Sequence, residues 1–187
     1  MQLTEEKALL DKIQTDPKEF SVLFDLYYKK IFGYIFRRVV DYDSSRDIAA
    51  ETFLKAFLKI NSFRWTGVSI SSWLFRIATN EVNQYFRKQK YSPESLNQLI
   101  ENHRLDFENP QTWEEEKQVM EKELKDHREF LQVQHHLKKF DLKYQEVIAL
   151  RYFENKCIKD IAEITGKNEG TIKSLLSRGM EKLRRLM

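Results

Sequence analysis

Apolar residues recur at steps of three and four along most of this chain, and this spacing constrains the fold more than any other feature of the sequence. Side chains three or four residues apart share one face of an α-helix, whereas a half-buried strand needs strict alternation. The 187 residues include only 5 Gly and 3 Pro, which is few for a strand-rich fold with many tight turns. The clearest helical stripe comprises Phe20, Leu23, Phe24, Tyr27, Ile31, Tyr34 and Ile35. The sequence therefore predicts an all-α protein.

Helix-start signals predict three helices within the first 90 residues. Asp16 suits the N-cap of the first helix, because a proline follows it directly and a carboxylate follows three residues later. Ser44 or Ser45 is the predicted cap of the second helix. Ser71 or Ser72 is the predicted cap of the third helix, which runs to the basic sequence RKQK. The apolar positions expected in the second and third helices are Ile48, Phe53, Ala56, Phe57 and Ile60, and Trp73, Leu74, Ile77 and Val82.

Residues 91–131 differ in composition from the segments on either side. They begin with a polar stretch that contains two prolines and shows no sustained period, and a charged helix is expected to resume near Trp113. Residues 1–90 carry 15 basic and 11 acidic side chains, residues 91–131 carry 5 and 11, and residues 132–187 carry 12 and 7. We therefore expect two small helical domains, 1–90 and 132–187, joined by a flexible acidic linker. The basic ends suit a polyanionic partner.

The segment from Ile158 onward has the pattern of a helix-turn-helix. An apolar stripe ends at the short turn TGKN, in which Gly166 suits a left-handed C-cap and Asn168 suits the cap of the next helix. In such a unit the second helix lies in the DNA major groove. The stripe of the first helix comprises Ile158, Ile161, Ala162 and Ile164.

The last helix is expected to present a basic and hydroxyl-bearing face. Lysine and arginine suit phosphate or guanine, and serine is a short hydrogen-bonding side chain. The alternative, a solvated basic face on a terminal helix, stays open at this point. The residues expected to face outward are Lys173, Ser174, Ser177 and Arg178, and those expected to face the core are Ile172, Leu175 or Leu176, Met180 and Leu183.

An irregular aromatic loop, NSFRWTGVSIS, precedes a helix rich in amides and arginines. A loop pocket beside a basic helix can capture an unstacked base by aromatic stacking and amide hydrogen bonds, while arginines hold phosphates. Trp73 and Phe75 are more typical of core positions. The candidate binding residues are Arg64 and Trp65 in the loop, and Asn80, Asn83, Arg87 and Lys88 along one side of the helix.

The sequence contains no apolar run long enough to span a bilayer, and its first residues, MQLTEEKALL, lack the apolar core of a signal peptide. We expect a cytoplasmic protein without membrane insertion, metal site or other cofactor. The single cysteine, Cys157, cannot form an internal disulfide. Its helical context predicts a small buried residue, and a redox role stays open.

Two longer stretches resemble a known family. The run DIAAETFLKAFLKINSFR, followed by SWLFRIATNEVNQYFRKQK, looks like the second conserved region of bacterial sigma factors of the extracytoplasmic-function (ECF) group. The C-terminal stretch YQEVIALRYFENKCIKDIAEITGKNEGTIKSLLSRGMEKLRR is similar to their fourth conserved region. Together the two stretches cover most of the chain, in the order that the family has.

The resemblance implies a protein that binds core RNA polymerase, directs it to promoters and helps to melt the DNA, and that is not an enzyme. By this resemblance the loop 63–71 and Asn80 would bind the melted downstream promoter element, and Asp47 and Glu51 would contact the polymerase clamp. An anti-sigma factor is a further implied partner. The residues implied to read the upstream element are Thr171, Lys173, Ser174, Ser177 and Arg178.

Two other functions fit parts of the sequence. A stand-alone helix-turn-helix regulator would need only the C-terminal domain and would bind closed duplex, usually as a dimer. An enzyme would have to use His135 and His136 or the EEE cluster, but adjacent histidines on a helix point about a third of a turn apart and rarely share a metal. The acidic linker has two interpretations as well: it either enters a basic channel of the polymerase or acts as a solvated spacer.

Overall fold

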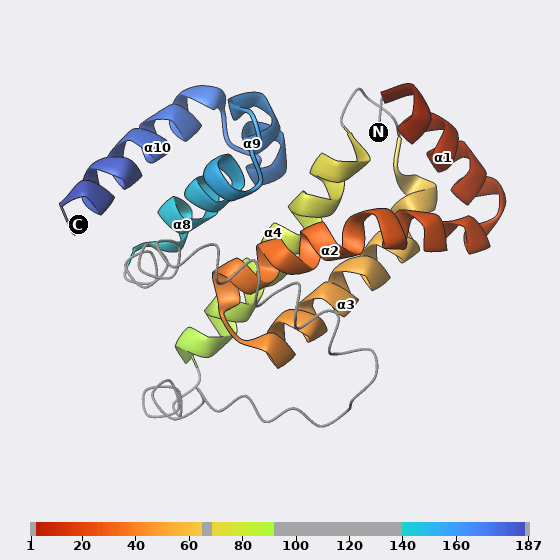
Figure 1. Ribbon diagram of the computed structural model, residues 1–187, viewed down its shortest axis with the longest axis horizontal. Helices are drawn as coiled ribbons and strands as arrows, with labels where there is room; N and C mark the ends of the chain where they lie inside the picture. Colours follow the sequence, from red (N-terminus) through yellow and green to blue (C-terminus); the bar gives the residue numbers. More distant parts are fainter. Residues whose placement is uncertain (1–2, 65–68, 92–139, 186–187) are drawn as a thin grey trace.

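The computed structural model describes residues 3–64, 69–91 and 140–185, and every regular element in these residues is a helix (Figure 1). The prediction of an all-α protein is confirmed. The linker, the helix expected near Trp113, the loop residue Trp65 and the pair His135 and His136 lie outside the described residues.

The N-terminal module is a helical bundle whose central helices pack against one another. It consists of α1 (Leu3–Thr15), η1 (Pro17–Glu19), α2 (Phe20–Val39), α3 (Tyr42–Lys59), η2 (Ile60–Ser62) and α4 (Ile70–Tyr91). Helix α2 contacts both α3 and α4, and α3 contacts α4. Burying one large apolar side chain stabilises the fold by about 1.5–3 kcal/mol. The fully buried side chains of this core include Leu23, Ile31, Tyr34, Ile35, Leu74 and Val82.

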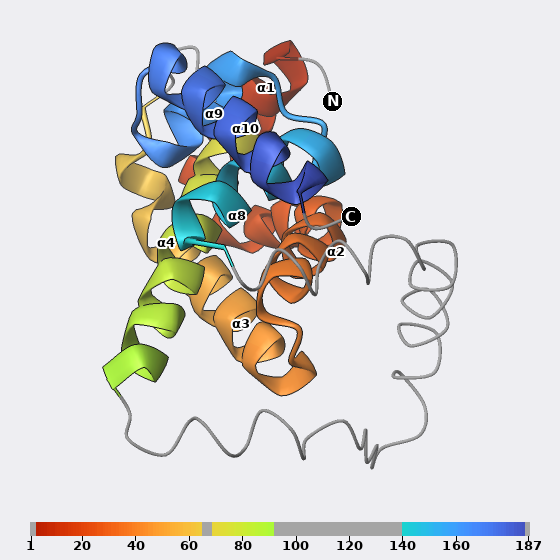
Figure 2. The ribbon, with the colours of Figure 1, turned by 90° about the vertical axis from the view of Figure 1, so that its left-hand side faces the viewer.

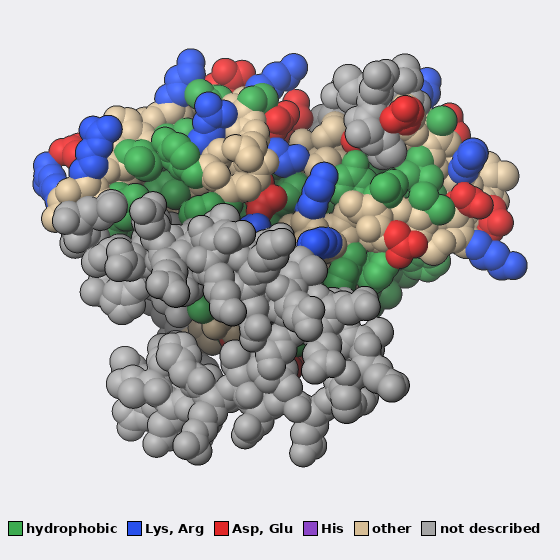
Figure 3. Space-filling model, in the orientation of Figure 1, with side chains coloured by type: hydrophobic (Ala, Val, Ile, Leu, Met, Phe, Trp, Pro, Cys, Tyr) green, Lys and Arg blue, Asp and Glu red, His purple; other side chains and the backbone are tan. Residues whose placement is uncertain are grey.

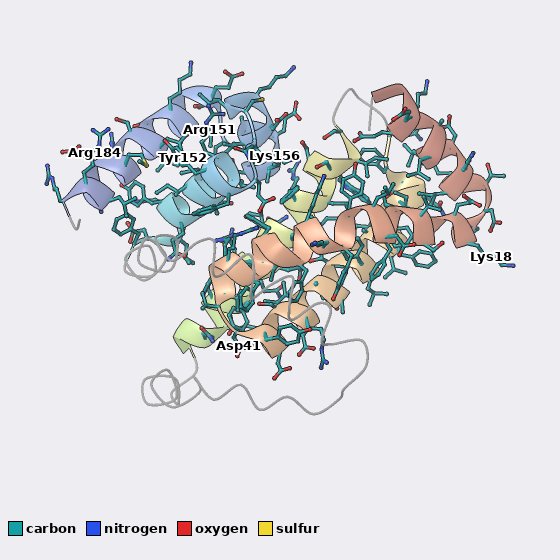
Figure 4. All side chains as sticks on the ribbon, in the orientation of Figure 1. Lys18, Asp41, Arg151, Tyr152, Lys156 and Arg184 are labelled. Atoms are coloured by element: carbon teal, nitrogen blue, oxygen red, sulfur yellow. The ribbon has the colours of Figure 1, made fainter. Side chains whose placement is uncertain are left out.

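Aspartates cap η1 and α3 in this bundle. Asp16 accepts a hydrogen bond from the backbone N–H of Lys18, at the position predicted from the sequence. The cap of α3 is Asp41, whose carboxylate accepts the N–H of Ser44 at 2.8 Å. The prediction of Ser44 or Ser45 was therefore wrong by three or four residues, because an aspartate placed earlier already provides the acceptor that the helix start needs. Figure 4 shows Asp41 at the turn between α2 and α3.

The third predicted helix, α4, also begins earlier than expected. The hydroxyl of Ser69 accepts the N–H of Ser72 at 3.0 Å, so Ser69 takes the capping role that was assigned to Ser71 or Ser72. Phe75 is buried as expected, and Trp73 is partly buried against the ring of Phe63 at 4.8 Å between centroids.

The sequence pattern did not predict α1. Its apolar residues Leu9, Leu10 and Ile13 are buried, and it contacts η2 as well as η1. An isolated helix of 13 residues is marginal in water, so α1 owes its stability to these tertiary contacts.

The C-terminal module is the predicted helix-turn-helix with two helical segments before it. It consists of α8 (Leu142–Ile148), η3 (Ala149–Phe153), α9 (Ile158–Thr165) and α10 (Glu169–Arg184). The first of these segments, α8, is α-helical, whereas η3 is wound as a π-helix. Helix α10 packs against both α8 and α9.

Cys157 is exposed, so the expectation of a buried cysteine was wrong. It is the N-cap of α9: its Sγ accepts the N–H of Asp160 at 3.5 Å, and the Asp160 carboxylate accepts the N–H of Cys157 at 3.2 Å. This reciprocal capping box requires the cap residue to stand outside the helix.

The two modules contact each other directly, and both views in Figures 1 and 2 place the C-terminal module beside α2 and α4. Helix α9 packs against α4, and η3 packs against α2. Arg37 and Glu154 form an ion pair at 2.8 Å. The Nζ of Lys156 donates to the Ser71 hydroxyl at 2.8 Å and lies 4.6 Å from the centroid of the Phe75 ring. Burial lowers the pKa of Lys156, while nearby carboxylates oppose this effect.

Candidate nucleic-acid interface

The turn between α9 and α10 is built as the sequence predicted. Gly166 has a φ of 69°, in the left-handed region that glycine adopts without steric cost. The side chain of Asn168 then accepts the N–H of Thr171 at 2.7 Å and caps α10. The turn and the cap together fix the direction in which α10 leaves α9.

Helix α10 has one buried face and one polar exposed face. Gly179 lets α10 approach α8 closely, because a Cβ at this position would lie 3.0 Å from the Cδ1 of Ile148. Met180 is only partly buried. The buried residues are Ile172, Leu175, Leu176, Gly179 and Leu183. Of the residues predicted to read DNA, Thr171, Lys173, Ser177 and Arg178 are exposed, and Ser174 is half-buried.

Basic side chains continue along α10 beyond the predicted reading positions. Lys182 and Arg184 are exposed near the C-terminal end of the helix, and Figure 4 shows Arg184 at that end. In Figure 3, Lys and Arg side chains are visible over the part of the surface formed by α10. A row of cations beside short hydroxyl side chains matches the chemistry of a helix that lies in a major groove between two phosphate backbones.

The predicted downstream-element residues that the structure describes differ in their exposure. Arg64 is exposed just after η2, and Asn80, Arg87 and Lys88 are exposed on α4. Asn83 is half-buried.

Asn83 belongs to a network that fixes α4 against α2. Its amide oxygen accepts a hydrogen bond from Nη2 of Arg38 at 2.9 Å. Arg38 is buried, and its Nη1 donates to the hydroxyl of Tyr34, which is 2.8 Å from Thr79 Oγ1. Burial raises the pKa of Tyr34, although Arg38 and Thr79 oppose the shift. The network occupies Asn83 but leaves Asn80, the residue next to Thr79, at the surface.

The predicted polymerase-contacting residues lie on a continuous exposed stripe of α3. Asp47 and Glu51 are exposed, and Glu51 pairs with Lys55 at 3.1 Å. Leu54 and Leu58 continue the same stripe and are 52% and 70% exposed. Sequence reasoning missed these two leucines, although both stand outside the buried stripe of their helix. Exposed leucines next to carboxylates are typical of a protein-binding surface.

Within the described ranges, no group of three or more potential ligand side chains is placed to hold a metal ion. None of the helices in those ranges has the length and apolar character needed to cross a bilayer.

Two family models define the class of protein. Residues 23–91 match the model of sigma-70 region 2, and residues 132–183 match the model of sigma-70 region 4. The ECF RNA polymerase sigma-E factor of Haemophilus influenzae is 32% identical over 96% of this chain and 93% of its own length. The chain belongs to the ECF group of sigma-70 family RNA polymerase sigma factors. Its function is that of a sigma factor, which directs RNA polymerase to promoters at transcription initiation.

Two further comparisons agree with this assignment. The ECF RNA polymerase sigma factor BldN of Streptomyces coelicolor is 28% identical over 90% of this chain, which spans 60% of the length of BldN. The sigma factor RpoE of Bartonella quintana, solved with the anti-sigma factor NepR, has the same fold at a TM-score of 0.66 and 22% identity. That match covers 90% of this chain and 96% of the solved chain. The alternative function, a stand-alone helix-turn-helix regulator, does not explain why residues 23–91 match sigma-70 region 2.

Proposed function

We propose that the two modules divide promoter recognition between them. Helix α10 reads the upstream element as duplex, and the segment from Arg64 into α4 binds the melted downstream element. The observation that carries the upstream assignment is the division of α10 into a buried apolar face and an exposed face that holds Thr171, Lys173, Ser177 and Arg178. The downstream assignment is supported by Asn80, Arg87 and Lys88, which stand exposed on α4. Asn83 has a structural bond to Arg38 and contributes less to DNA binding.

Run-off transcription tests this proposal directly. Purified chain is mixed with core polymerase and fragments of the source genome, and the RNA 5′ ends are mapped. We expect initiation at a restricted set of sites that share two sequence elements. Initiation at the same sites with core polymerase alone, or none with the chain present, would contradict the proposal.

The exposed stripe of α3 is the proposed docking surface for core polymerase. Its leucines supply apolar area and its carboxylates supply charge, a combination typical of specific interfaces. The double variant of Leu54→Ala and Leu58→Ala should weaken binding to core polymerase, measured by competition with the unmodified chain. Lys59→Ala, an exposed change beside the stripe, is the matched control. Equal competition by both variants would exclude the stripe from the interface.

We also propose a cytoplasmic location, no catalytic activity of the chain itself, and regulation by an anti-sigma factor. The likeness to RpoE, which was solved with the anti-sigma factor NepR, supports the last point. Affinity purification of the chain from its native cells tests the proposed regulation by an anti-sigma factor. The purification is done both from cells with their normal amount of core polymerase and from cells depleted of it. A stoichiometric partner that prevents polymerase binding is expected, and recovery of polymerase subunits alone would contradict this part.

A further inference from the structure

Helix α1 contains no residue of either proposed DNA-binding surface, yet two of its side chains reach the described ends of the connection between η2 and α4. We propose that α1 positions the downstream-element site, with Gln14 holding the end of η2 and Glu6 holding the start of α4. This inference rests on the proposed function of Arg64 and α4. In Figure 1, α1 lies next to η2 and the first turn of α4.

Gln14 fixes the backbone just before Arg64. Its Nε2 donates to the carbonyl oxygen of Ile60 at 3.2 Å and to that of Phe63 at 3.1 Å. These acceptors are 46 and 49 residues away in sequence, so both bonds tie α1 to a distant segment. The direction in which the chain leaves η2, and therefore the position of Arg64, depends on them.

Glu6 fixes the other end of the connection. Its side chain is buried, and its Oε2 accepts the backbone N–H of Ile70, the first residue of α4, at 3.0 Å. Its Oε1 accepts the hydroxyl of Tyr27 at 3.0 Å. A carboxylate is favourable at the start of a helix, where backbone N–H groups lack partners within the helix. Burial, together with the charge of Glu6, raises the pKa of Tyr27, so Tyr27 stays protonated and remains a donor.

The two contacts act through one rigid element. Eight residues separate Glu6 from Gln14, which corresponds to about 12 Å along an α-helix. Helix α1 therefore sets the distance between the end of η2 and the start of α4. The contact of the Phe63 ring with Trp73 is a further link between the same two segments. A helix that served only to bury apolar surface would not need two polar side chains directed at backbone atoms of these segments.

Three variants of the full chain test the proposal in holoenzyme assembled with core polymerase. Gln14→Ala removes both bonds at η2 from an exposed position, so it should leave the fold intact. Glu6→Ala removes the acceptor at Ile70, whereas Glu6→Gln retains one acceptor oxygen and an amide that can donate to Tyr27. Thr15→Ala is the matched control on α1, because the Thr15 hydroxyl donates to the Asp11 carbonyl of its own helix.

The readout is opening of the DNA on a promoter fragment identified by the run-off assay. Permanganate reactivity of unpaired thymines should fall about three- to tenfold for Gln14→Ala, because a displaced Arg64 would lose contacts with the melted strand worth about one net hydrogen bond. In the same variant, promoters that differ by single bases in the downstream element should differ less in DNA opening than they do with the original chain. Binding to upstream-element duplex and the urea midpoint should match those of Thr15→Ala. DNA opening should be reduced in Glu6→Ala and should return to the level of the original chain in Glu6→Gln.

Three other results would contradict the proposed role of α1. Unchanged opening and unchanged base discrimination in Gln14→Ala, together with a defect in Asn80→Ala, would overturn the role of α1 and leave the proposed downstream site standing. Unchanged opening in both Gln14→Ala and Asn80→Ala would overturn the downstream site and the role of α1 together. A loss in Gln14→Ala that follows its urea midpoint would reduce α1 to a stabilising helix and overturn the proposal.

Discussion

At the scale of single residues, substitution of Arg178 can distinguish contact with a base from contact with a phosphate. It is exposed at the C-terminal end of the proposed reading face of α10, which begins at Thr171. Arg178→Ala should weaken binding to promoter duplex by about 1–3 kcal/mol if the side chain reads a base, and should mainly lower the salt dependence if it touches phosphate. Fluorescence anisotropy at several salt concentrations measures both quantities.

The matched control for this prediction is Arg184→Ala. Arg184 is equally exposed but lies at the C-terminal end of α10, away from the predicted reading positions (Figure 4). Its removal should not change sequence discrimination. An Arg178→Ala variant that has unchanged affinity and an unchanged salt slope would remove Arg178 from the DNA interface.

Tyr34 gives a pH prediction at the same scale. It is fully buried, and burial raises its pKa above the ordinary value of 10.0. A phenol whose pKa is higher in the folded than in the unfolded chain stabilises the fold fully below the unfolded pKa and loses that contribution as the pH rises through the folded pKa. The free energy of unfolding by urea should therefore begin to fall as the pH approaches the unfolded pKa of about 10, and should continue to fall at higher pH.

The variant Tyr34→Phe isolates this effect. It should be less stable than the original chain near neutral pH, because it removes the bonds to Arg38 and Thr79. Its stability should fall less steeply at alkaline pH, since the phenol no longer ionises on unfolding. Parallel pH profiles of the two chains would show that the buried hydroxyl does not control alkaline unfolding.

At the scale of elements, the close approach of α8 and α10 depends on Gly179. A Cβ there would lie 3.0 Å from Ile148, whose side chain is almost completely buried and has little freedom to move. Gly179→Val should lower the free energy of unfolding by about 1–3 kcal/mol through overpacking. Gly170→Ala is the control: its Cβ would meet only Asn168 Oδ1 at 3.6 Å, so stability should be unchanged or slightly higher. Equal urea midpoints for both variants would contradict this account.

The elements that the sequence predicted well are those whose signals are local. Gly166 and Asn168 lie within four residues of the groups they satisfy, and the boundaries of α9 and α10 follow from them. Helix α1 was missed because its supporting contacts, such as that of Glu6 with Tyr27, join residues far apart in the sequence. Cys157 was assigned to the core from helical context, whereas the reciprocal bonds with Asp160 place it outside the helix.

The candidate site shows the same division between local and long-range information. The outward direction of Lys173 and Arg178 follows from helical periodicity alone, and both are exposed as predicted. The engagement of Asn83 by Arg38 has no sequence signal, because α2 and α4 are brought together only by the folded core. The positions of Leu54 and Leu58 outside the buried stripe of α3 were detectable from the sequence, but such positions indicate an interface only after the helix has been placed in the fold.

At the scale of the whole molecule, the packing of α9 on α4 keeps the two modules together. Lys156 lies at this contact, with carboxylates of Glu154, Asp160 and Glu6 near enough to influence its pKa. Lys156→Glu would place a further carboxylate among these groups and remove the bond to Ser71. We expect the modules to separate, with a larger radius of gyration in small-angle X-ray scattering.

The control for this prediction is Lys159→Glu, which makes the same charge change at an exposed position of α9. Its radius of gyration should equal that of the original chain. A compact Lys156→Glu variant, or equal expansion of both variants, would contradict the role assigned to Lys156.

The exposed thiol of Cys157 has a practical consequence. It is the only cysteine in the sequence, and it adjoins the lysine that bonds across to Ser71. A single environment-sensitive dye can therefore be attached beside the contact between the two modules without any substitution in the chain. The emission of the dye, followed in a stopped-flow instrument after mixing with core polymerase, would show whether the two modules separate before or after the chain binds the polymerase.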